Sequence, residues 1–141
     1  MTDKYNLQRF IDAQHQHYDT ALAEIINGRK QSHWMWYIFP QITGLGSSPM
    51  AQKYAIQDID EAMEFLEHPI LGRRLIEISS ALLHLETNDA YQVFGSPDNM
   101  KLRSSMTLFA SAPNTNEVFE KVLQKFFQGQ QDEATLTMIG K

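Results

Sequence analysis

Residues 30–53 read KQSHWMWYIFPQITGLGSSPMAQK, and no Asp, Glu, Lys or Arg occurs between Lys30 and Lys53. A membrane span needs about 20 continuous apolar residues. This stretch is interrupted by Pro40 and Gly44 and carries polar side chains, so it does not meet that requirement. We therefore expect it to form the buried hub of a globular fold and expect no membrane partner.

The composition limits the classes of protein that fit. The chain has 141 residues, 43% of them hydrophobic, which is enough for one domain over 1–141 with a core of its own. Twelve basic and 17 acidic residues give a formal net charge of −5, which argues against extended nucleic-acid binding. Without cysteine and without a histidine pair at ligand spacing, we expect no metal and no cofactor. The first residues lack the apolar run of a secretory signal, so the expected location is cytoplasmic.

Apolar residues around the hub recur with the 3.6-residue period of a helix, and no alternating strand pattern of useful length occurs. We expect one helix between Asn6 and Gly28 and a short one after Ser32. Further starts, marked by capping residues or proline, are expected at Ser48-Pro49, Asp58, Pro69, Asn88-Asp89, Ser96-Pro97, Asn116 and Asp132. The prediction is an all-α, single compact domain of about seven to eight short and medium helices.

Residues 28–36, GRKQSHWMW, place two cations, an imidazole and two indoles close together. Aromatic planes beside cations suit a planar, anionic ligand such as a nucleotide. The candidate ligand-binding residues here are Lys30, Ser32, His33, Trp34 and Trp36. The alternative is structural: the cations offset the carbonyl end of the first helix, and the two tryptophans belong to the core.

Residues 95–106, GSPDNMKLRSSM, form the second candidate segment. A helix N-terminus with free amides beside Gly95, and with Lys101 one turn in, can bind an anion. Ser104 and Ser105 form helices poorly, which suggests either contact with a ligand or close packing by small side chains.

Four further phrases share one family pattern: 32–41 (SHWMWYIFPQ), 44–46 (GLG), 68–72 (HPILG) and 101–109 (KLRSSMTLF). Together they resemble the bacterial domain-of-unknown-function 1810 family over nearly the whole chain. That resemblance implies a small all-α fold and brings no settled activity.

A second set of short motifs, in chain order, resembles the helical NADAR (YbiA-like) family, whose members cleave N-glycosidic bonds of ADP-ribosylated bases or riboside phosphates. The motifs are Ala13-Gln14, Ser48-Pro49-Met50, Asn88-Asp89-Ala90-Tyr91, Gly95 and Lys101. This resemblance implies that Trp34 or Trp36 stacks on a base, that Lys30 and Lys101 hold phosphate, and that Asn88 or Asp89 meets a ribose. It adds Gln14, Ser48 and Gly95 to the ligand-binding candidates.

The chain departs from the NADAR pattern at Gln8, where that family carries an acid, and glutamine cannot exchange a proton as a carboxyl group does. Asp12, Asp89 or Asp98 would have to replace that acid, and Asp89 and Asp98 are the catalytic candidates.

The sequence leaves two functions open. One is binding of an ADP-ribose-like or other phosphorylated nucleoside with N-glycosidic cleavage, and the other is a non-enzymatic protein-interaction or structural module with no small-molecule ligand.

Overall fold

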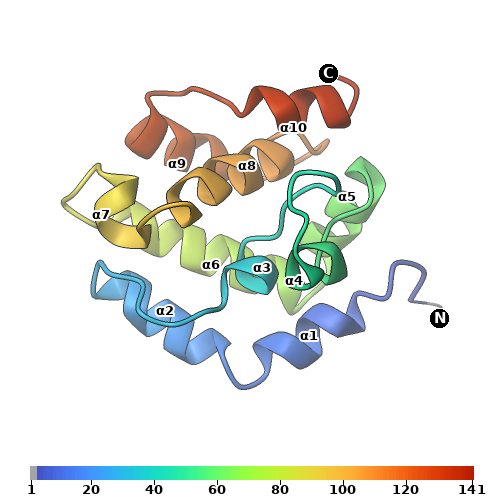
Figure 1. The fold of residues 1–141 in the computed structure, drawn as a ribbon, viewed down its shortest axis with the longest axis horizontal. Helices are drawn as coiled ribbons and strands as arrows, with labels where there is room; N and C mark the ends of the chain where they lie inside the picture. Colours follow the sequence, from blue (N-terminus) through green and yellow to red (C-terminus); the bar gives the residue numbers. More distant parts are fainter. Residues whose placement is uncertain (1–2) are drawn as a thin grey trace.

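The structure, a computed structural model, describes residues 3–141 and contains ten α-helices in that range (Figure 1). They are α1 (Gln8–Gln14), α2 (Tyr18–Ile26), α3 (Met35–Ile38), α4 (Pro49–Lys53), α5 (Ile59–Glu67), α6 (Leu71–Leu83), α7 (Ala90–Phe94), α8 (Asp98–Ala110), α9 (Val118–Phe127) and α10 (Glu133–Met138). The described residues form no strand, only an isolated parallel bridge between Ile42 and Ile56. The all-α prediction is confirmed, whereas the predicted number of seven to eight helices is too low.

The helix expected between Asn6 and Gly28 is two helices, α1 and α2, separated by a turn at residues 15–17. The apolar pattern misses this break because Ile11 and Tyr18 are seven residues apart, about two helical turns. The spacing therefore stays in phase across the turn, and periodicity alone cannot reveal it.

Several helix starts follow from local capping, as the sequence predicts. Ser48 Oγ accepts a hydrogen bond from the Ala51 amide at 3.1 Å, and Asp58 Oδ1 accepts one from Glu61 N at 2.9 Å. Glu61 does not complete a capping box, because its Oε1 accepts from Gln57 N instead. Its Oε2 pairs with Arg9 at 2.9 Å, which connects α1 to α5.

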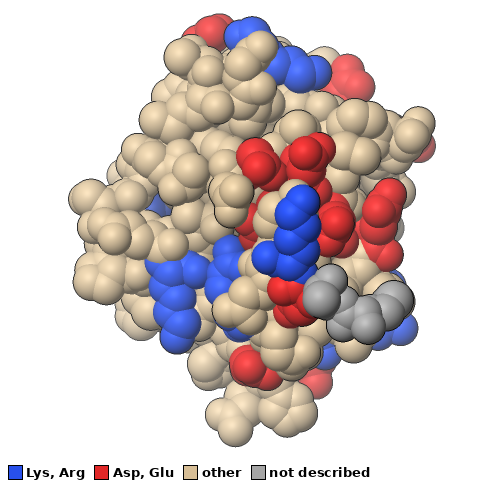
Figure 2. All heavy atoms as spheres, turned by 90° about the vertical axis from the view of Figure 1, so that its right-hand side faces the viewer, with Lys and Arg blue, Asp and Glu red and all other residues tan. Residues whose placement is uncertain are grey.

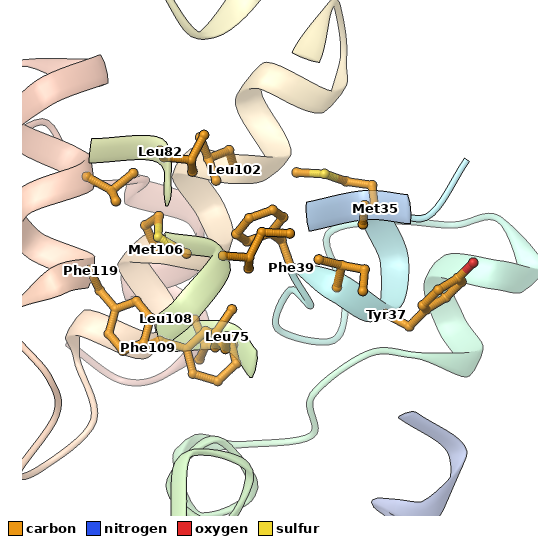
Figure 3. Close-up of a cluster of buried hydrophobic side chains, with 14 of the residues drawn as sticks. Met35, Tyr37, Phe39, Leu75, Leu82, Leu102, Met106, Leu108, Phe109 and Phe119 are labelled. Atoms are coloured by element: carbon orange, nitrogen blue, oxygen red, sulfur yellow. The ribbon is translucent and has the colours of Figure 1, made fainter. Parts of the chain in front are cut away.

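The first half of the uncharged stretch is the hub that we expected. Trp34, Met35, Phe39 and Ile42 are each at most 2% exposed and belong to one connected core. Figure 1 shows α3 in the middle of the molecule, and Figure 3 shows its side chains clustering with those of α6, α8 and α9. The second half is different, since most of residues 43–49 are exposed and form a surface loop that leads into α4.

A close approach fixes the junction of α5 and α6. A Cβ atom at Gly72 would collide with the carbonyl oxygen of Leu66. Only glycine allows the first turn of α6 to pass this close to the end of α5.

None of the helices within residues 3–141 is long and apolar enough to cross a membrane.

Candidate functional site

The two candidate segments meet in the structure. Residues 27–36, which lead from α2 into α3, lie beside residues 91–98, which lead from α7 into α8 (Figure 1). The Lys30 amide joins them by donating to the Val93 carbonyl at 2.7 Å. We call this junction the seam. Its central contact is a backbone hydrogen bond, so it does not depend on any one side chain.

Two hollows open along the seam. The larger, of about 550 Å³, is lined by residues 27–30 and 91–95. The smaller, of about 360 Å³, is lined by residues 30–36, Phe94 and 96–98. Both have Lys30 and Phe94 in their walls, so they are neighbours along one groove.

Two lysines share the carboxylate of Asp98 in the wall of the smaller hollow, and of these Lys30 lines that hollow and Lys101 does not. Lys30 Nζ lies 2.9 Å from Asp98 Oδ2, and Lys101 Nζ lies 3.6 Å from Asp98 Oδ1. Lys30 also donates to the Ser32 carbonyl at 2.6 Å, and its side chain is only 7% exposed. Two ammonium groups against one carboxylate leave one positive charge unmatched within this lysine–aspartate cluster. An anion is the natural partner for that charge.

The two tryptophans have different roles. Trp34 is 1% exposed, and its Nε1 donates to Glu24 Oε1 at 2.9 Å, so the core interpretation holds for this residue. Trp36 is half-buried, lines the smaller hollow, and has Lys101 Nζ 5.9 Å from its ring centroid. Of the two indoles, Trp36 is therefore the one that can present a ring face to a ligand.

Glu24 was not among the residues expected at the site, yet it fixes the wall of the smaller hollow. Its carboxylate accepts hydrogen bonds from the Gln31 amide at 2.7 Å, the Ser32 amide at 3.0 Å, the Ser32 hydroxyl and the Trp34 indole. Burial raises the pKa of Glu24, but these hydrogen bonds, led by the one from the Ser32 hydroxyl, outweigh it and lower the pKa to about 2. In the sequence Glu24 looks like an ordinary acidic residue on a helix, and no local signal identifies its role.

Four predicted site residues lie elsewhere. Gln14 is buried and its Nε2 donates to a backbone carbonyl of α3 at 2.8 Å, while Ser48 caps α4. Asp89 caps α7 through the amides of its first turn, and Asn88 accepts from an α9 lysine at 3.0 Å. None of the four lines either hollow of the seam. The structure thus gives Asn88 and Asp89 no place at a ribose bound there.

The α8 serines pack against neighbouring helices and line neither hollow. Ser104 Oγ donates to Asp132 Oδ2 at 3.0 Å, at the start of α10. Ser105 is fully buried, and its hydroxyl has no hydrogen-bond partner among residues 3–141. Close packing explains both positions. Of the remaining candidates, Ser32 and His33 line the smaller hollow and Gly95 lines the larger one.

The carboxylates around Gln8 belong to another face. Gln8 donates to Asp12 at 2.9 Å and lines a separate hollow of about 380 Å³ with Asp3, Glu64 and other residues between α1 and α5. Figure 2 views the molecule from that side and shows acidic side chains gathered there. Among the described residues 3–141, Asp98 is the one carboxylate in the walls of the seam hollows. Among residues 3–141, no three His, Asp or Glu side chains are arranged to hold a metal ion.

The chain was compared with known families and structures. The model of the family described as "Protein of unknown function (DUF1810)" matches residues 4–139. The chain is similar to a protein of known structure, the conserved hypothetical protein Rv1873 from Mycobacterium tuberculosis. The two sequences are 41% identical, the match covers 99% of each chain, and the two structures superpose with a TM-score of 0.96. No curated protein matches the chain. The family match spans all ten helices of the described residues, and the chain belongs to the DUF1810 family.

Proposed function

We propose that this protein binds a small phosphorylated nucleoside of the ADP-ribose class in the smaller hollow of the seam. The observation that carries the proposal is the lysine–aspartate cluster beside the half-buried ring of Trp36. A phosphate group supplies the negative charge that the cluster lacks, and a flat base or nicotinamide-like ring covers the indole.

Asp98 is suited to a role at the sugar. Carboxylates accept hydrogen bonds from ribose hydroxyls, and Asp98 is the carboxylate that the smaller hollow offers. Both of its oxygens face lysine ammonium groups, and a phosphate that draws those lysines toward itself leaves the carboxylate to face the sugar. Hydrolysis of an N-glycosidic bond passes through an oxocarbenium-like state, whose positive charge a carboxylate beside the sugar stabilises. We propose this cleavage as the reaction, with Asp98 as its catalytic residue: the bond between the ribose C1′ and the base nitrogen breaks, the oxygen of a water molecule bonds to C1′, and a proton of that water ends on the departing base.

Calorimetric titration with ADP-ribose tests binding. Lys30→Met removes the charge and keeps most of the side-chain stem, so we expect the affinity to fall about tenfold or more, as for loss of a charge-assisted contact. Lys121→Met, which removes an exposed, ion-paired lysine on α9, is the control and should leave the affinity unchanged. A protein that binds no phosphorylated nucleoside would instead support the non-enzymatic interaction module.

Asp98→Asn separates binding from cleavage. If Asp98 acts in catalysis, this variant still binds ADP-ribose but no longer releases the base from an N-glycosidic substrate, as followed by chromatography. Wild-type protein that binds without releasing a base would remove the catalytic part of the proposal and leave the binding part intact.

A further inference from the structure

We propose that the larger hollow of the seam is a second binding subsite, in which Tyr91 stacks on an aromatic ring and Arg29 meets an adjoining phosphate. The inference rests on the proposed function at the smaller hollow and specifies its ligand. That ligand has two parts joined by a diphosphate, and it spans both hollows.

The first observation is an exposed aromatic ring. Tyr91 is 61% exposed on α7 and lines the larger hollow. Large aromatic rings usually bury most of their surface, and an exposed ring in the wall of a hollow provides a stacking platform for a base.

The charge at the same hollow is also unmatched. Arg29 is exposed, lines the larger hollow, and forms no ion pair with any residue among 3–141. Within the part of the chain that the structure describes, no carboxylate lines this hollow. The overall negative charge of the chain therefore does not extend into it, and the acidic face in Figure 2 lies on another side, around α5. A guanidinium group without a carboxylate partner is a good ligand for phosphate.

The spacing of the two hollows indicates a two-part ligand. The residues in their walls follow one another along both segments, and Lys30 and Phe94 stand between the hollows. A ribose phosphate can occupy only one hollow. A nucleoside diphosphate sugar can place its base over Tyr91, its diphosphate along Arg29 and Lys30, and its second ribose beside Asp98, so that a second ring carried by that ribose covers Trp36.

Calorimetric titrations with ADP-ribose and with ribose 5-phosphate test this subsite. Tyr91→Ala and Arg29→Ala should each weaken ADP-ribose binding about tenfold, the effect expected for one stacked base or one charge-assisted contact. Tyr91→Phe retains the ring and should bind like the wild type. Ribose 5-phosphate carries no base, so Tyr91→Ala should leave its affinity unchanged. Met138→Ala and Arg73→Ala, at exposed positions outside the seam, are the matched controls.

Three other results would overturn the second subsite or the proposed function. Unchanged ADP-ribose affinity in both Tyr91→Ala and Arg29→Ala would overturn the second subsite while leaving the binding site at Lys30 standing. Equal losses for ADP-ribose and ribose 5-phosphate in Tyr91→Ala would also overturn it, because the effect would then not come from the ring. Wild-type protein that binds neither compound would overturn the proposed function as well.

Discussion

Glu24 shows how one side chain can set the shape of the candidate site. Its carboxylate holds the turn before α3 through the backbone and hydroxyl of Ser32 and the indole of Trp34. Glu24→Gln replaces a charged acceptor with a neutral one, and we expect the free energy of unfolding to fall by about 1–3 kcal/mol. Urea denaturation at neutral pH measures this loss. Glu86→Gln, at an exposed position, should change the stability little and serves as the control.

The same residue makes the stability depend on pH. The pKa of Glu24 is lowered in the folded protein to about 2, from a reference value of 4.5. Its stabilising contribution is therefore complete above pH 4.5 and is lost as the pH falls from 4.5 to about 2. Melting temperatures measured across this range should fall more steeply in the wild type than in Glu24→Gln. Parallel curves for the two proteins would contradict this role of Glu24.

The α8 serines make a paired prediction. Ser104→Ala removes the hydrogen bond to Asp132 and should lower the free energy of unfolding by about 1 kcal/mol. Ser105→Ala removes a buried hydroxyl that has no hydrogen-bond partner among residues 3–141. The free energy of unfolding of this variant should therefore be unchanged or slightly higher than that of the wild type. Chemical denaturation of both variants checks the difference. A larger loss for Ser105→Ala than for Ser104→Ala would show that the hydroxyl of Ser105 has a partner.

The two candidate segments could be picked out from the sequence because of their local composition. Residues 30–36 and 95–98 stand out because cations, aromatic rings and a helix start occur close together in the chain, and the roles assigned to them stay predictions. The roles of Glu24 and Asn88 could not be predicted, because they depend on contacts with segments seven or more positions away. Trp34 and Trp36 are two positions apart and both lie in the wall of the smaller hollow, and only the packed structure shows that Trp34 is buried whereas Trp36 is half-buried.

At the scale of helices, the junction of α5 and α6 depends on the absence of a side chain at Gly72. Gly72→Ala forces a Cβ atom against the carbonyl oxygen of Leu66, so the two helices must move apart. We expect a loss of about 1–3 kcal/mol in the free energy of unfolding, as for other overpacked sites. Gly140→Ala is the comparison, because no atom lies within 4 Å of the added Cβ there and only backbone strain remains. Equal stability of wild type and Gly72→Ala in thermal denaturation would contradict this packing.

Helix starts were easier to predict than helix breaks. Ser48, Asp58 and Asp89 each accept from amides of the following turn, and these bonds form within four residues. The break between α1 and α2 leaves no such mark, because the apolar pattern remains in phase on its two sides. The sequence therefore predicted one helix where the structure has α1 and α2.

At the scale of the whole molecule, amphipathic periodicity was enough to predict the all-α class. It could not show that residues 27–36 lie beside 91–98, since the two segments are about 60 positions apart and their contact depends on the packing of the entire core. That contact creates the hollows. The proposed function therefore depends on a contact between distant segments, and no local sequence pattern predicts that contact.

The most direct measurement is a titration followed by the two indole N–H signals in ¹H–¹⁵N correlation spectra, because the chain contains two tryptophans. Both tryptophans lie in the wall of the smaller hollow, but Trp36 is half-buried, whereas Trp34 is 1% exposed and its Nε1 is bonded to Glu24. Trp36→Phe assigns the signals. Saturating ADP-ribose should shift the Trp36 signal strongly and the Trp34 signal less, because the ring of Trp34 faces Lys30 from inside the core. If neither signal moves while ADP-ribose is in excess, the smaller hollow is not a site for a phosphorylated nucleoside.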